Sequence, residues 1–121
     1  MFGFLSYFFD EIFEPEYDFE KYESMTEIIR EFKDTYNYND DSSAWFAKLK
    51  LIADKFGYAS DMKAYKQNPE QYKGNVSHVA EIIRVAVTGR KNTPDLWTIM
   101  QILGTESCSK RLDMAIDHLA G

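Results

Sequence analysis

Residues 79–97, VAEIIRVAVTGRKNTPDLW, contain the pattern that decides the fold of this 121-residue chain. Apolar side chains recur in this stretch at intervals of three and four: Val79, Ile82, Ile83, Ala86 and Val87. This spacing is typical of an amphipathic helix, and a glycine directly after such a run is typical of a helix end. We therefore expect a helix that ends at Gly89, followed by a basic turn and the start of a second helix.

The same spacing recurs on both sides of this stretch. Apolar stripes run through Trp45, Leu49, Ile52, Ala53 and Phe56, through Leu96, Ile99, Met100 and Leu103, and through Cys108, Leu112, Ala115, Ile116 and Leu119. Gly57 and Gly104 close the first two, and residues 18–36 also have a helical apolar side. Residues 58–76 are polar and form a long connection with room for one short helix. No stretch alternates as a strand does, so the sequence predicts an all-α, compact bundle of five to seven helices.

The helix expected after the basic turn has a clear start signal. Thr93 can cap its first N–H groups, Pro94 suits the first helical position, and Asp95 suits the positive end of the helix dipole. The sequence therefore predicts Thr93 as the capping residue.

Composition and charge describe a compact domain with an uneven charge distribution. Hydrophobic residues make up 45% of the chain, which excludes disorder over most of its length. The one cysteine cannot form an internal disulfide, so we expect a reducing, cytoplasmic location. No apolar run is long enough to cross a membrane, and we expect no signal peptide. Residues 1–41 carry a net charge of −9 and residues 42–121 a net charge of +3. We therefore treat 1–41 as an acidic, aromatic-rich connecting segment that includes the first helix, and 42–121 as the main helical domain.

Signatures of catalysis and metal binding are mostly absent from the sequence. There is no glycine-rich phosphate loop, no His-Glu-x-x-His and no Cys-x-x-Cys. His78 opens a helix and is best interpreted as a capping residue, and His118 as a surface histidine near a helix end. Cys108 lies on an apolar stripe and is expected to be a buried small side chain. We predict no catalytic residue and no metal site.

The basic turn between the two central helices is suited to single-stranded nucleic acid. Arginine and lysine side chains bind phosphates, free N–H groups at a helix start bind anions, and exposed rings stack with bases. Rings and charges also interleave upstream, where Lys63, Lys66, Tyr72 and Lys73 are further candidates for RNA binding. The alternative is an ordinary corner between helices with exposed bases and a buried Trp97.

An ordered set of motifs in this region resembles one known family. The set comprises Arg84-Val85-Ala86-Val87-Thr88-Gly89, Thr93-Pro94-x-Leu96, Ile102-Leu103-Gly104-x-Glu106 and Lys110-Arg111-Leu112. It resembles the C-terminal anticodon-binding domain of bacterial glutamyl-tRNA synthetases, which are class I aminoacyl-tRNA synthetases. The match covers roughly residues 45–119. It departs from the family at Asp95, where the family has glycine and where a carboxylate would stand near RNA.

The resemblance implies a helical domain that recognises the anticodon of tRNA-Glu. It also implies that ATP, Mg²⁺ and the ligase reaction belong to a catalytic domain absent here, so that this chain binds no cofactor and is not an enzyme on its own. Carried over residue by residue, the family pattern implies an RNA-binding set that is found within 84–96. Its members are Arg84, Thr88, Arg90, Lys91, Asn92, Thr93, Pro94 and Leu96.

The sequence is also compatible with two other functions. The aromatic, acidic N-terminus, through Phe4, Phe8 and Phe9, could instead make the chain a helical protein–protein interaction module. A DNA-binding helix-turn-helix is less consistent with the sequence, because the chain is acidic overall and the stripe around Trp97 is apolar. We expect neither DNA nor a membrane as a partner.

Overall fold

The computed structural model describes residues 17, 22, 24–90, 93 and 95–120. Within these residues the chain forms five α-helices and one short 3-10 helix, and no named strand. They are α2 (Met25–Thr35), α3 (Ser42–Lys55), α4 (Met62–Gln67), η2 (Pro69–Gln71), α5 (Val76–Thr88) and α6 (Leu96–Ala120). The predicted all-α fold is confirmed. The predicted interface residues Phe4, Phe8 and Phe9 lie outside the described residues.

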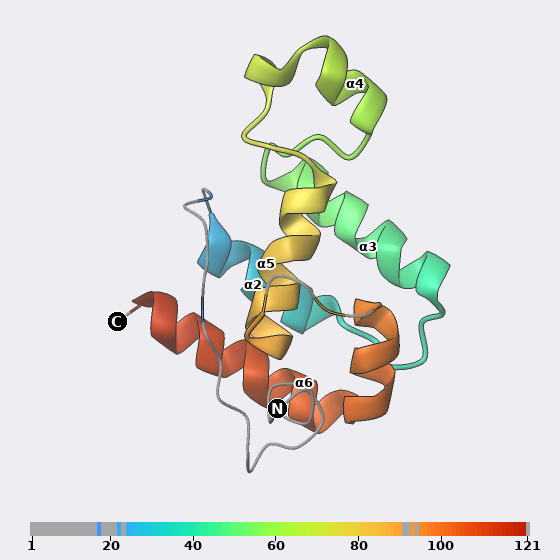
Figure 1. Ribbon diagram of the computed structural model, residues 1–121, viewed down its shortest axis with the longest axis vertical. Coiled ribbons are helices and arrows are strands. Elements are labelled where there is room, and N and C mark those ends of the chain that lie inside the picture. The colour runs from blue at the N-terminus through green and yellow to red at the C-terminus, as the bar shows by residue number, and fades with distance from the viewer. Residues whose placement is uncertain (1–16, 18–21, 23, 91–92, 94, 121) are drawn as a thin grey trace.

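Helix α5 is the central element of the bundle. It packs against α6, α3 and α2, and α2 also packs against α3 and α6 (Figure 1). The apolar stripe predicted for α5 is fully buried, as is most of the stripe on α3. Residues of α2 share this core, so the segment 1–41 contributes to the same apolar interior as the segment 42–121.

Helix α2 is shorter than the helix predicted over 18–36. It begins at Met25, because Ser24 adopts a left-handed conformation with φ 64° that breaks the helical path. Tyr22 leaves the expected helical stripe: its ring stacks on His78 at a centroid distance of 5.0 Å, and its hydroxyl donates to Glu81 at 2.8 Å. Residues 18–21 and 23 lie outside the described part of the chain.

The connection 58–75, which we call the α4 lobe, projects from one end of α5 (Figure 1). It contains α4 and η2, in agreement with the prediction of a long connection with a short helix. A single parallel bridge between Ala59 and Asn75 joins its two ends. The buried Tyr58 lies under Gly74, where an added Cβ would meet the Tyr58 ring at 3.0 Å.

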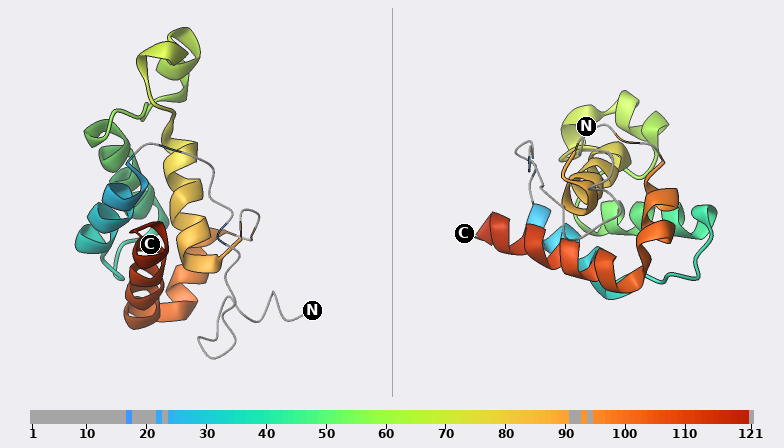
Figure 2. Two further views of the ribbon diagram at one scale, coloured as in Figure 1. Left: turned by 90° about the vertical axis from the view of Figure 1, so that its left-hand side faces the viewer. Right: turned by 60° about the horizontal axis from the view of Figure 1, so that its bottom comes forward.

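Helix α6 changes direction at Gly104. This residue has φ 84° and ψ 170°, which is not a helical conformation, and Figure 2 shows the two halves of α6 running in different directions. The sequence predicted two helices separated at Gly104, and the two halves correspond to them. Gly57, two residues after the end of α3, and Gly89, the C-cap of α5, also have positive φ, in agreement with the predicted glycine ends.

Candidate functional site: the α5–α6 corner

The RNA-binding residues expected from the sequence gather where α5 ends and α6 begins. We call residues 84–97 the α5–α6 corner. Lys91, Asn92 and Pro94, which belong to the predicted set, lie outside the described residues. The structure describes the remaining members, and their burial separates them into two groups.

Thr88 and Leu96 form the buried group. Only 1% of Thr88 and 2% of Leu96 are exposed. The Thr88 hydroxyl donates to the carbonyl oxygen of Arg84 at 2.7 Å and accepts the backbone N–H of Arg90 at 3.1 Å. These two side chains therefore do not face solvent. They pack inside the protein and help to fix the end of α5 and the start of α6.

Arg84, Arg90 and Thr93 are half-buried and reach the surface. The Nε of Arg84 is buried without a hydrogen-bond partner in the described part of the structure. Arg90 Nη1 donates back to the carbonyl oxygen of Gly89 at 3.1 Å, so the guanidinium lies over the end of α5. The corner therefore presents two arginines beside the point at which the chain leaves α5.

The turn out of α5 depends on Gly89. Its φ of 73° is left-handed, a conformation that glycine adopts without the steric cost that a Cβ brings. Its N–H donates to the carbonyl oxygen of Val85 at 2.8 Å, which closes the last turn of the helix. The predicted end of this helix is confirmed.

Asp95, and not Thr93, caps the start of α6. The Asp95 carboxylate accepts the backbone N–H of Thr98 at 3.1 Å and the Thr98 hydroxyl at 2.8 Å. The prediction that Thr93 caps this helix is therefore wrong: α6 begins two residues later than that cap requires. The same contacts give a structural reason for a carboxylate at position 95, since it pairs with N–H groups at the positive end of a helix.

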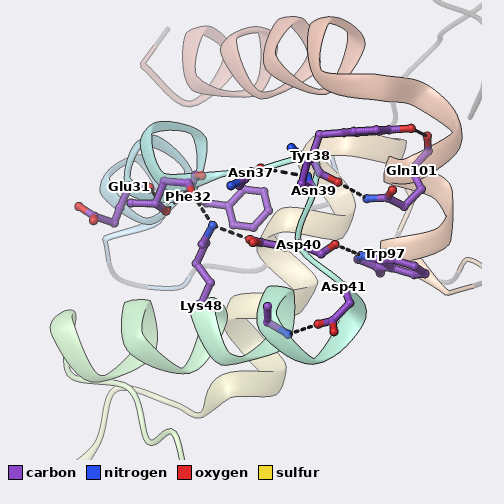
Figure 3. A network of polar contacts seen from close by, with 12 residues as sticks. Glu31, Phe32, Asn37, Tyr38, Asn39, Asp40, Asp41, Lys48, Trp97 and Gln101 are labelled. Atoms are coloured by element: carbon purple, nitrogen blue, oxygen red, sulfur yellow. Dashed lines mark hydrogen bonds and ion pairs between the residues drawn. The ribbon is translucent and has the colours of Figure 1, made fainter.

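The first half of α6 is fixed to the loop between α2 and α3. Trp97 Nε1 donates to the carbonyl oxygen of Asp40 at 3.1 Å. Tyr38 and Gln101 exchange two hydrogen bonds, hydroxyl to carbonyl at 3.1 Å and amide to carbonyl at 3.0 Å. Figure 3 shows that these contacts form one network with the Asp40–Lys48 ion pair at 2.7 Å. Trp97 packs against the core but is half-buried, so it is less buried than the ordinary-corner alternative expected.

The second predicted set lies at the opposite end of α5. Lys63 and Lys66 are exposed on α4, and Lys73 is exposed after η2. Tyr72 is half-buried, with its ring 6.3 Å from that of Tyr65. Figure 1 shows the α4 lobe beyond the N-terminal end of α5, whereas the corner lies at its C-terminal end. The structure therefore does not bring the two predicted sets together.

The histidines and the cysteine have the places that the sequence indicated. His78 Nδ1 accepts the backbone N–H of Asn75 at 3.0 Å, and the Asn75 side chain accepts the N–H of Ser77, so a capping box opens α5. His118 is exposed near the end of α6, with Tyr17 4.6 Å away between ring centroids. Cys108 is buried. No group of three metal-binding side chains occurs among the described residues.

One functional candidate was missed by sequence reasoning. Arg111 has no exposed surface at all and lies in the second half of α6. A charged residue beside the apolar Leu112 gives no sequence signal that distinguishes it from an exposed arginine on a helix. The resemblance drew attention to Lys110-Arg111-Leu112 as a motif but assigned it no role.

Comparison with known proteins shows the family. The sequence model described as the anticodon binding domain matches residues 3–116, which is nearly the whole chain. The chain belongs to this family. The anticodon-binding domain described here has the helical architecture that the resemblance implied, and none of its described helices meets the length and apolarity that a membrane span needs.

Several curated proteins named glutamate–tRNA ligase contain a segment that is similar in sequence to this chain. The chain is 44% identical over 118 residues to the glutamate–tRNA ligase of Acetivibrio thermocellus, covering 93% of this chain and 21% of the relative. It is 49% identical over 113 residues to the enzyme of that name from Clostridium perfringens, covering 88% and 21%, and 36% identical to that of Sorangium cellulosum, covering 89% and 20%. The chain thus spans about a fifth of the length of these relatives. No solved structure matches it.

Proposed function

We propose that this anticodon-binding domain recognises the anticodon of tRNA-Glu on behalf of a longer, cytoplasmic glutamate–tRNA ligase. The observation that carries the proposal is the match of nearly the whole chain to about one fifth of proteins named glutamate–tRNA ligase. In this proposal the rest of the parent enzyme supplies ATP and Mg²⁺ binding and the ligase reaction. The present chain has a binding role and no catalytic one, and it takes no cofactor.

The α5–α6 corner is the proposed anticodon-binding surface. Arg84 and Arg90 reach the surface there, and Lys91 follows in the sequence, so phosphates and base edges would meet two or three cations. Asn92, Thr93 and Pro94 complete the surface that the resemblance assigns to the bases. Thr88 and Leu96 support this surface from below, because both side chains are buried.

The α4 lobe is proposed as a second contact with RNA. Lys63, Lys66 and Lys73 are exposed cations at the far end of α5, and Tyr72 lies beside them. Lysines in such a position would bind the backbone and carry no base specificity. The lobe would therefore add salt-sensitive affinity, and the corner would supply discrimination between anticodons.

An NMR titration tests the proposal directly. The labelled domain is titrated at low salt with an anticodon stem-loop of tRNA-Glu and, in parallel, with a stem-loop whose last two anticodon bases are changed. We expect shifts concentrated in residues 84–97 that are larger and tighter with the first RNA. Equal shifts with both RNAs would reduce the interaction to phosphate attraction, and no shift with either would contradict the proposal.

A further inference from the structure

Arg111 is the largest side chain that the structure buries completely. Arginine is almost never fully buried unless its charge is paired or hydrogen-bonded, because a buried charge loses its hydration. The lysine that precedes it, Lys110, is exposed on the same helix. Lys110 keeps its charge hydrated, whereas Arg111 loses this hydration. We take this difference as a sign that the guanidinium of Arg111 has a specific role inside the bundle.

The guanidinium contacts the end of α5. Arg111 Nη1 donates to the carbonyl oxygen of Val87 at 3.1 Å. Carbonyls in the last turn of a helix have no partner within the helix and carry the partial negative charge of its dipole. Arg111 therefore supplies both a hydrogen bond and a positive charge to the C-terminal end of α5.

The next residues of the chain form the start of the α5–α6 corner. Val87 is followed by Thr88 and Gly89, whose own hydrogen bonds set the path of Arg90. Arg111 also acts on Tyr17: burial raises the pKa of the Tyr17 hydroxyl, and the Arg111 cation lowers it in part. The guanidinium has no exposed surface and lies between α6 and the end of α5, where no RNA can reach it.

We propose that Arg111 is a positioning residue for RNA binding, which fixes the last turn of α5 and thereby the placement of Gly89 and Arg90. The proposal rests on the proposed function, since it assigns a buried residue to the same surface. It differs from a general stabilising role because it predicts a local effect on the corner. It also differs from a direct contact, because the number of phosphates neutralised does not depend on Arg111.

Arg111→Met tests the proposal, with Lys110→Met as the matched control that removes the same charge from the adjacent exposed position. We expect Arg111→Met to bind the tRNA-Glu anticodon stem-loop about tenfold more weakly. In the wild type the last turn of α5 is ordered before RNA binds, whereas in the variant it must become ordered on binding, which lowers the affinity. The slope of log affinity against log salt should not change, and amide exchange at Gly89 and Arg90 should accelerate. Lys110→Met should leave this amide exchange as it is in the wild type.

Arg111→Lys keeps a charged donor and should recover part of both the affinity and the amide protection. If Arg111→Met does not fold, Arg111→Lys is compared with the wild type in the same two measurements, with weaker binding at an unchanged salt slope expected. Wild-type affinity in Arg111→Met, or unchanged exchange at Gly89 and Arg90, overturns the positioning role alone. Absence of RNA binding by the wild type overturns the proposed function, and the positioning role with it.

Discussion

Polar side chains at the α5–α6 corner, together with Arg111 behind it, fall into two groups by burial. Thr88 and Arg111 are inside and satisfy backbone groups at the end of α5, whereas Arg84 and Arg90 reach the surface. The inner pair supplies partners to the Arg84 and Val87 carbonyls, which matters because an unpaired buried carbonyl costs about 1–3 kcal/mol. The outer pair lies at the surface beside this fixed helix end.

Asp95 is exposed at this surface and also caps α6, which gives a prediction at the scale of one residue. Asp95→Ala removes the acceptor for the Thr98 N–H and hydroxyl, so the free energy of unfolding should fall by about 1 kcal/mol, as for other lost N-caps. The same change removes a negative charge from the proposed RNA surface, so affinity for the stem-loop should rise. Urea denaturation and RNA titration measure the two effects.

Asp117→Ala is the control for Asp95→Ala. Asp117 is exposed near the other end of α6, where a carboxylate is not a cap. Its removal should change the free energy of unfolding by less than about 0.5 kcal/mol. If Asp95→Ala were as stable as Asp117→Ala, the capping role of Asp95 would be contradicted.

At the scale of the element, α6 is defined by its break at Gly104. The φ of 84° and ψ of 170° lie in a region that only glycine populates readily, although an added Cβ would meet no atom within 4 Å beyond the neighbouring residues and the backbone of its own helix. Gly104→Ala should therefore destabilise the fold by about 1–3 kcal/mol through backbone strain alone. Thr105→Ala, at the exposed next position, is the control and should be near neutral. Thermal or urea unfolding distinguishes the two, and equal stabilities would show that the break does not depend on glycine.

Helix existence could be predicted from the sequence more reliably than helix boundaries. The stripes of α3 and α5 and their glycine ends were predicted because each pattern is local. The start of α2 was not, because neither the left-handed conformation of Ser24 nor the contact of Tyr22 with His78 and Glu81 on α5 is visible in the sequence. The cap of α6 was misplaced by two residues because Thr93 and Asp95 are both good caps.

The candidate site could be predicted only in outline. Sequence and resemblance brought together Arg84, Arg90 and Thr93, which do lie at one corner. The apolar stripe predicted for α6 already included Leu96, but neither sequence nor resemblance could show that Thr88 is buried, because its burial depends on how α5 and α6 pack. The buried Arg111 was missed for the same reason: its partner, the Val87 carbonyl, lies 24 residues away in the chain.

At the scale of the whole molecule, α5 separates two cationic regions. Its 13 residues span about 20 Å, with the α4 lobe at one end and the corner at the other (Figure 1). An RNA loop that contacts both ends of α5 would place phosphates against the cations at both. The slope of log affinity against log salt then reports how many phosphates are neutralised. The arrangement therefore makes the extent of the interface measurable without a structure of the complex.

The double variant Lys63→Ala/Lys66→Ala tests whether RNA reaches the α4 lobe. If each lysine neutralises one phosphate of a single strand, the slope of log affinity against log salt should become shallower by about 0.7 for each lysine removed. Preference for the tRNA-Glu loop over the loop with changed bases should stay as in the wild type, because backbone contacts carry no sequence information. Lys33→Ala is the control, since Lys33 is engaged in an ion pair with Asp113 at 2.6 Å. If the double variant had the wild-type slope, RNA would contact only the corner. If it lost the preference for the tRNA-Glu loop, the α4 lobe and not the corner would discriminate between bases.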